Sequence, residues 1–296
     1  MKKLLLIATI IAAILSLGSC IREPEQSTYD ISRGFTNVRV DAIEADLNIL
    51  PTDGAPKVVC KGDFTVESMV GVLHIEEIND KKSLIDRIFT KNDYEVTIYL
   101  PEEEYETLVV YCDTGDVNIE GVNASEISIF VDTGDIELSD ATASDVKISG
   151  DTGDVDVKNV TTDVFELKVG TSKTELSDID CSTLKVTGDT GRVDIKNARA
   201  DEVSILTETG DITLENAISS GKITISVDTG DVTLNACDGG EVYITSNTGD
   251  VKGSFLTDKI IFAESNTGKI DIPKLTSGGK CEITTNTGDI TITIGQ

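Results

Sequence analysis

The residues best placed to do chemistry are two series of carboxylates that flank a recurring Thr-Gly step. The tripeptide Thr-Gly-Asp, or a close variant of it, occurs ten times between Asp113 and Asp289, at intervals of 19 or 20 residues. Calcium is a hard cation that binds oxygen ligands, so stacked carboxylates are weak calcium candidates. In the longest uninterrupted acidic stretch these candidates are Asp113, Asp116, Asp132, Asp135, Asp151 and Asp154.

A structural role explains the same motif without a ligand. Calcium-binding solenoids use a Gly-Gly-x-Gly-x-Asp pattern with inward acids, whereas alternation here directs the acids to solvent. Glycine suits a corner with positive φ, and a preceding Asp or Asn can close a turn on backbone amides. Continued alternation predicts that the Thr points inward. The expected corner residues are Thr114, Gly115, Thr133, Gly134, Thr152, Gly153, Thr209, Gly210, Thr229, Gly230, Thr248, Gly249, Thr287 and Gly288.

Other combinations of reactive side chains are sparse. Arg192, beside Asp189, Asp211 and Asp231, is the one cluster comparable to the acids and base of β-helical polysaccharide lyases. Charge relief within an acidic ladder is the simpler explanation. His74 has no Cys or His at ligand spacing, and no nucleophile elbow, His-Glu-x-x-His or Walker motif occurs. We therefore expect no catalysis, no cofactor and no dedicated metal site.

The cysteines show no disulfide framework. After Cys20 there are five, of which Cys60 and Cys112 could pair. The other three lie on repeats two or more apart, beyond the ~7 Å Cα limit of a disulfide.

Apolar residues recur at fixed positions in each repeat and predict the elements that carry the motif. Numbered from the Thr, they occur six and four residues before it and three, five and eight residues after it. Two alternating strands per repeat and a period near 20 indicate stacked coils. The predicted fold is all-β: a single-stack parallel β-solenoid of about ten 19–20-residue coils with an irregular N-terminal β cap. The general chirality of parallel crossovers favours a right-handed coil.

The expected organisation is a signal peptide at 1–19, a tether at 20–28, a β cap at 29–105 and the solenoid at 106–296. Within the cap, strand-like runs cover 37–40, 46–50, 57–60, 71–76 and 94–100, and a short helix is possible near 84–89. The sequence from Glu44 to Ile49 looks like a degenerate copy of the repeat that begins at Asp113.

The N-terminus predicts export. Lys2 and Lys3 precede an apolar run from Leu4 to Leu17 that is short for a membrane span. Leu17-Gly18-Ser19-Cys20 resembles the lipobox of bacterial lipoproteins, which implies a thioether-linked lipid on Cys20 and a location on the extracytoplasmic face of the cell membrane. An ordinary secretory signal is the alternative.

The chain is strongly acidic, with a formal net charge of −28 at pH 7. Such a chain will not bind nucleic acid through backbone phosphates, and anionic lipid should repel it, so the lipid must supply the membrane attachment. It has no Trp and one His, and 4% of its residues are aromatic, so aromatic sugar platforms are expected to be scarce.

The last repeat predicts an exposed sheet edge. The chain reaches Gln296 directly after Thr291–Ile294. If that coil is the end of the stack, Ile292 and Ile294 lie at an edge that can support self-association.

The Asp-Thr-Gly-Asp-Val units and the sequence from Asn247 to Ile294 resemble a bacterial β-strand-repeat family, a domain of unknown function described as a "putative adhesin". The resemblance covers roughly residues 36 to 294 and implies a cell-envelope protein without catalytic residues. The first hypothesis is a lipid-anchored binding or structural rod whose partner is an envelope protein or glycan. The alternatives are a component of envelope-stress sensing and a glycan-active β-helix enzyme.

Overall fold

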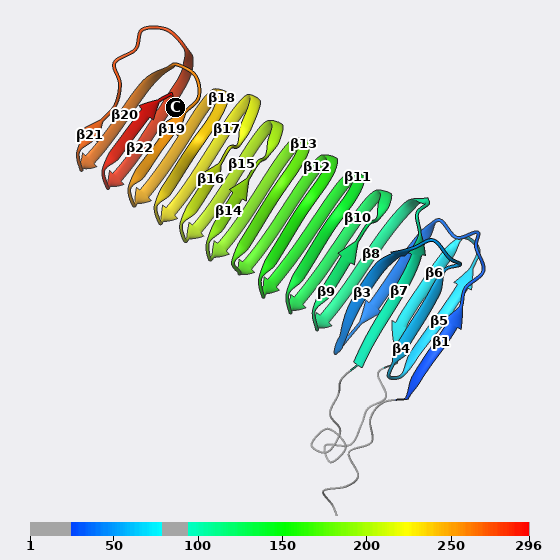
Figure 1. Cartoon of the computed structure of the whole chain (residues 1–296). Helices are drawn as coiled ribbons and strands as arrows, with labels where there is room; N and C mark the ends of the chain where they lie inside the picture. Colours follow the sequence, from blue (N-terminus) through cyan, green and yellow to red (C-terminus); the bar gives the residue numbers. More distant parts are fainter. Residues whose placement is uncertain (1–24, 79–93, 296) are drawn as a thin grey trace, which may run out of the picture.

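Stacked parallel coils form a long rod in the computed structural model, which describes residues 25–78 and 94–295 (Figure 1). β10 (Asn123–Thr133) pairs in parallel with β8 (Glu104–Thr114) on one side and β11 (Ile136–Thr152) on the other. The Thr residues of successive repeats lie in register. The predicted β-solenoid is therefore confirmed, and the described residues contain no helix. None of them belongs to a helix long and apolar enough to span a membrane.

The remaining strands of the coils are named here in the order of the sequence. They are β9 (Val117–Glu120), β12 (Val155–Thr171), β13 (Thr174–Thr190), β14 (Val193–Lys196), β15 (Arg199–Thr209), β16 (Ile212–Glu215), β17 (Ile218–Thr229), β18 (Val232–Thr248), β19 (Val251–Phe255), β20 (Lys259–Thr267), β21 (Ile270–Asp271), β22 (Gly279–Thr287) and β23 (Ile290–Ile294).

The predicted apolar columns form the core. In the first regular coil Leu108, Val110, Val117, Ile119 and Val122 are all buried, and the equivalent residues stack on them along the rod. Burial of apolar surface stabilises such columns by about 25 cal/mol per Å². Because each coil covers the next, the stack supplies the core that a single coil lacks.

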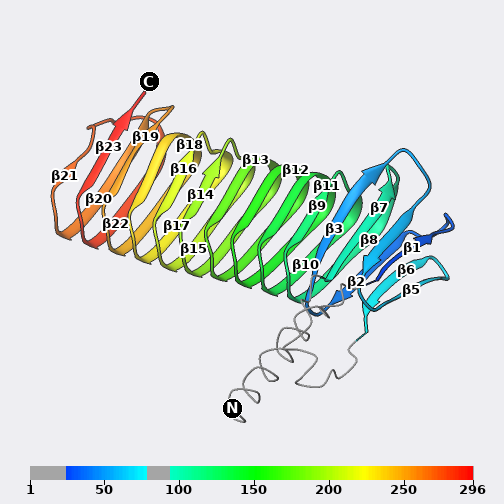
Figure 2. The same cartoon turned by 60° about the horizontal axis from the view of Figure 1, so that its bottom comes forward.

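The N-terminal cap continues the parallel stacking of the coils, and antiparallel strands flank it (Figure 2). β2 (Asn37–Ala42) stacks in parallel on β8, and β3 (Ala45–Thr52) on β9. Leu47 pairs with Val117 and Ile49 with Ile119, so the predicted degenerate copy is confirmed. β6 (Val72–Glu77) pairs in parallel with β2, and β7 (Tyr94–Pro101) pairs in parallel with β3. β1 (Gln26–Asp30), β4 (Lys57–Lys61) and β5 (Phe64–Met69) add the antiparallel pairings. β1 begins within the expected tether, and the possible helix lies outside the described residues.

The coils at the C-terminal end do not stack in chain order. β22 pairs with β18 on one side and with β20 on the other, and β23 lies between β19 and β21. The end of the rod is therefore β20–β21, and the expectation that Ile292 and Ile294 form the exposed edge is wrong. Ile292 is buried, whereas Phe262 on β20 is 58% exposed.

A buried lysine spans the inserted strand. Lys259 on β20 is 2% exposed, and its Nζ contacts a carboxylate oxygen of Asp238 on β18 and lies 2.8 Å from Thr257 Oγ1. Gly279 of β22 lies between these strands, and a Cβ on it would lie 3.3 Å from Lys259 Nζ and 2.6 Å from the carbonyl oxygen of Gly240. The missing side chain at Gly279 thus leaves room for the ion pair across the inserted strand.

Candidate functional site

The Thr-Gly-Asp corner exposes the threonine. In each of the ten repeats the Thr is exposed, so the expectation that it points inward is wrong. The residue two positions before it, such as Cys112 or Val131, is the last inward side chain of the strand. The next two residues are both exposed although the strand continues to the Thr, so the inward–outward alternation ends one position earlier than predicted.

The glycine of the corner is required for two reasons. Gly134 has φ +143°, which side chains rarely adopt, and its equivalents Gly115, Gly153, Gly210 and Gly288 have φ between +134° and +152°. A Cβ on Gly134 would also lie 2.0 Å from the carbonyl oxygen of Gly115 in the preceding coil. The predicted role of glycine is confirmed, and close coil-to-coil approach adds to it.

The aspartate after the glycine holds the next coil. The backbone N–H of Asp135 donates to Oδ1 of Asp116 at 2.9 Å, and that of Asp154 donates to Oδ1 of Asp135 at 2.7 Å. The ladder begins in the cap, where Asp46 Oδ1 accepts from the N–H of Asp116 at 3.1 Å. A corner leaves backbone donors outside the regular sheet pairing, and each carboxylate satisfies one of them. We call this series the ladder row.

The ladder row also follows the altered strand order. Asp289 N–H donates to Asp250 Oδ1 at 2.8 Å, and Lys269 N–H donates to Asp289 Oδ1 at 2.7 Å. The final corner of the rod carries Lys269, which has no acceptor for a further coil.

The carboxylates before the Thr differ from the ladder row. Asp113, Asp132 and Asp151 are exposed and have no hydrogen-bond partner among the described residues. We call these three the outer acid row. Of the six calcium candidates, Asp116, Asp135 and Asp154 already accept backbone hydrogen bonds. Within 25–78 and 94–295, no three Asp, Glu, His or Cys side chains converge as metal ligands would.

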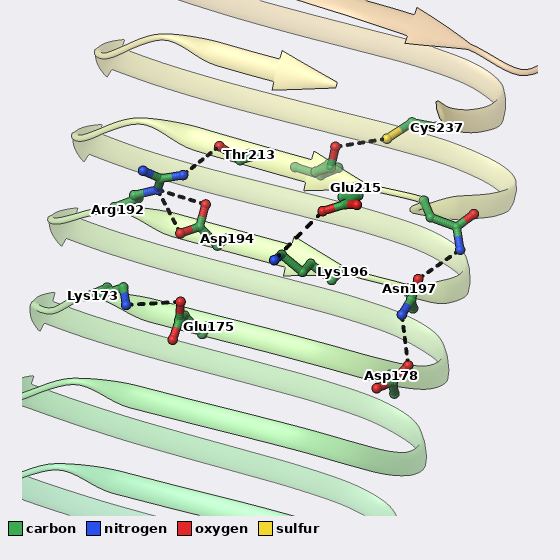
Figure 3. Close-up of polar contacts among 12 residues, drawn as sticks. Lys173, Glu175, Asp178, Arg192, Asp194, Lys196, Asn197, Thr213, Glu215 and Cys237 are labelled. Atoms are coloured by element: carbon green, nitrogen blue, oxygen red, sulfur yellow. Dashed lines mark hydrogen bonds and ion pairs between the residues drawn. The ribbon is translucent and has the colours of Figure 1, made fainter. Parts of the chain in front are cut away.

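Arg192 forms an ion pair with Asp194, a residue that the sequence analysis did not single out (Figure 3). Its Nε lies 2.7 Å from Asp194 Oδ2, and Nη2 lies 3.5 Å from Thr213 Oγ1. Lys173, which also replaces an acid of the ladder row, pairs with Glu175 at 3.0 Å. Each cation thus pairs with the acid two residues on along its own strand. Of the lyase-like grouping with Asp189, Asp211 and Asp231, only the charge of Asp211 acts on Arg192, and it adds less to the raised pKa of Arg192 than Asp194 does.

A second corner carries an asparagine and aspartate series that the sequence analysis missed. Asp140, Asn159, Asp178, Asn197 and Asn216 have φ between +53° and +56°. Asn and Asp tolerate this left-handed conformation better than other residues with a Cβ. Asn216 Nδ2 donates to Asn197 Oδ1 at 2.9 Å, and Asn197 Nδ2 to Asp178 Oδ1 at 3.0 Å (Figure 3). The signal was an Asn or Asp seven residues after the Thr in five consecutive repeats.

The cysteines of the rod are free and buried, so the possible bond between Cys60 and Cys112 is not formed. Burial raises the pKa of Cys60 to about 11 and the pKa of Cys112 to about 12. Cys20 lies outside the described residues. His74 Nε2 lies at hydrogen-bond distance, 2.7 Å, from Asp41 Oδ2 on the neighbouring strand.

One outward face lacks the acidic character of the rest. It comprises the residues five and three positions before the Thr on β8, β10, β11, β12 and β13. They are Val109, Tyr111, Ser128, Phe130, Lys147, Ser149, Glu166, Lys168, Lys185 and Thr187. Three lysines and one glutamate give this face a net charge of +2 on a chain of −28. We call it the lysine–aromatic face. The low aromatic content of the chain did not reveal it.

Comparison with known proteins identifies a family. The family model described as "Toastrack DUF4097" matches residues 65–217 and 177–296. A solved structure from Bacteroides fragilis, described as a "putative adhesin", is 18% identical, covers 91% of this chain and 97% of its own, and has a TM-score of 0.36. One from Parabacteroides distasonis, described as a "putative lipid binding protein", is 15% identical, covers 90% and 96%, and has a TM-score of 0.39. No curated protein matches the chain.

Proposed function

The chain belongs to the Toastrack DUF4097 family, and from this premise we propose that it is a non-catalytic, adhesin-like binding rod held at the cell envelope. The observation that carries the proposal is the use of the repeated motif. Its glycine permits close stacking and its aspartate accepts the N–H of the next coil. The motif thus builds a long, regular support whose outward faces differ in charge, which suits display of a binding surface.

Attachment through Cys20 is the second part of the proposal. The basic start, the short apolar run and Leu17-Gly18-Ser19-Cys20 support export and lipid modification. Several acyl chains give stable membrane attachment where one alone would not. In this proposal the lipid is attached close in sequence to the cap, and the faces of the solenoid are the surfaces offered to extracellular partners.

Labelling in cells tests both parts. Wild-type protein expressed with radiolabelled palmitate is expected to carry label and to be cleaved by protease added to intact cells. Cys20→Ser is expected to lose the label and to leave the membrane fraction. Unlabelled wild-type protein, or protection from external protease, would refute the anchored rod. Turnover of an envelope polysaccharide that is lost in Arg192→Ala would instead favour the glycan-active enzyme.

A further inference from the structure

A row of stacked groups crosses the junction between the cap and the solenoid on the lysine–aromatic face. The Arg39 guanidinium lies over the Tyr111 ring, 4.9 Å from its centroid. The Tyr111 and Phe130 rings stack with centroids 4.9 Å apart and an interplanar angle of 9°. Arg39 is fixed from below by two 2.7 Å hydrogen bonds to Asp41, which also lies 2.7 Å from His74 Nε2. The rings are thus held by a rigid polar base at one end.

The stack stops where a further ring would fit. The next residue in register after Phe130 is Ser149, and the one after that is Lys168. Because the ring spacing equals one coil step of ~4.8 Å, a ring above Ser149 would lie one step from Phe130 and one step from Lys168. Among residues 25–78 and 94–295, no side-chain ring or cation stacks on the second face of Phe130. Ser149 therefore leaves one coil step without a ring between Phe130 and Lys168, which we call the open step.

The charges around this step suit an anion. Lys185 Nζ donates to Glu166 Oε1 at 2.9 Å, and Lys168 Nζ lies 3.6 Å from the same oxygen. The hydrogen bond from Lys185 lowers the pKa of Glu166, and the charges of Lys168 and Lys147 act in the same direction. Glu166 thus faces three lysines, and Glu126 and Asp145 line the hollow beside Lys147. The lysine next in register to Ser149, at the open step itself, is Lys168. The side chain of Lys168 is 61% exposed and is available to a ligand.

We infer that the step above Ser149 binds one ring of an acidic glycan, and that the lysine–aromatic face is the glycan-binding surface of the rod. The sugar ring stacks on Phe130, whose face favours the C–H groups of a pyranose. Its carboxylate pairs with Lys168 and Lys147. A ring with one negative charge can both stack on Phe130 and pair with Lys168, whereas a neutral sugar can only stack on Phe130. The inference rests on the proposed function and names the class of its ligand.

Calorimetric titration of the full chain in detergent tests the site. The probe is tetragalacturonate, and its methyl ester has the same rings without the charge. We expect the ester to bind about tenfold more weakly, and Phe130→Ala and Lys168→Gln each to weaken the acid form about tenfold. Polyglutamate, which has charge without rings, is expected to bind no better than the ester.

A variant that fills the open step above Ser149 with a ring tests the site most sharply. Ser149→Tyr continues the ring stack, so the protein should fold with an unchanged melting temperature while binding falls about tenfold or more. Ser226→Tyr is the matched control, because Ser226 occupies the same row, is also half-buried and lies on β17, away from Phe130. Its affinity is expected to stay within about twofold of wild type.

Several outcomes would overturn the inference. They are wild-type affinity in Ser149→Tyr, equal binding of the acid and its ester, tighter binding of a single-stranded oligonucleotide, or no binding of tetragalacturonate at millimolar concentration. None of these results affects palmitate labelling at Cys20 or accessibility on intact cells. Failure of the glycan site is therefore distinguishable from failure of the anchored rod.

Discussion

Residues that look alike in the sequence have different tasks in this rod. Asp132 and Asp135 lie three positions apart in one repeat, yet only Asp135 accepts a backbone hydrogen bond from the next coil. Residues at the second corner also differ, because some side chains tolerate its positive φ and others do not. Ala236 occupies that corner with φ +51°, where its equivalents are mostly Asn or Asp.

Ala236→Asn should stabilise the protein. Alanine in the left-handed region costs roughly 1 kcal/mol, which Asn or Gly largely avoids. We expect the free energy of unfolding in urea to rise by about 1 kcal/mol for Ala236→Asn and similarly for Ala236→Gly. Asn216→Ala, the reverse change one coil earlier, should lower it by at least as much because the bond to Asn197 is lost. A destabilised Ala236→Gly would contradict the strain at this position.

The ladder row should also contribute to acid sensitivity. The hydrogen bond from Lys252 and the N–H of Asp289 lower the pKa of Asp250. A depressed pKa stabilises the fold above the unfolded carboxyl range, and that stabilisation is lost as pH falls through the folded pKa. Asp250→Asn should therefore unfold at a slightly lower urea concentration than wild type at pH 7. The difference should vanish in acid, and a constant difference across pH would argue against this explanation.

Among elements, the order of the last strands is the most specific result. β22 lies between β18 and β20, and Lys259 reaches across it to Asp238. Removal of one partner of a buried ion pair leaves the other charge unpaired. We expect Lys259→Ala to lower the free energy of unfolding by about 3 kcal/mol, measured in urea.

Disulfide trapping tests the strand order itself. Thr245 on β18 and Thr284 on β22 are direct neighbours. Thr245→Cys with Thr284→Cys should form a disulfide, since neighbouring strands lie ~4.8 Å apart and the Cα limit is ~7 Å. Thr245→Cys with Glu264→Cys should not, because β22 separates the two strands. Efficient bonding in the second pair would indicate coils stacked in chain order.

Much of the coil could be predicted from the sequence, because each apolar column depends on neighbours within one repeat. The strand pairs, their register and the glycine corner follow from periodicity and from the steric freedom of glycine. The orientation of Thr114 and its equivalents could not be predicted, because the corner interrupts the inward–outward alternation at a position that periodicity cannot locate. The exchange of β20 and β22 depends on long-range packing around Lys259 and Gly279. The open step above Ser149 needed the register between coils.

At the scale of the whole molecule, the repeat divides the circumference into surfaces of different charge. The corners carry the outer acid row and the ladder row, and the lysine–aromatic face lies on the strands before them. The acidic rows keep a repetitive β-protein soluble. One end of the rod is covered by the cap, and the other is the coil β20–β21, whose corner carries Lys269. The Thr-Gly-Asp motif is used for stacking the coils, whereas the lysine–aromatic face is not. That face is therefore free to bind a ligand.

The comparison of the two acidic rows tests most directly whether the motif serves the fold. One triple variant changes Asp116, Asp135 and Asp154 to Ala, and the other changes Asp113, Asp132 and Asp151 to Ala. Both remove three charges, so they differ only in the hydrogen bonds between coils. Urea unfolding should show a loss of about 3 kcal/mol for the first, at about 1 kcal/mol for each bond. The second should match or exceed wild type, and equal losses in the two variants would contradict the account.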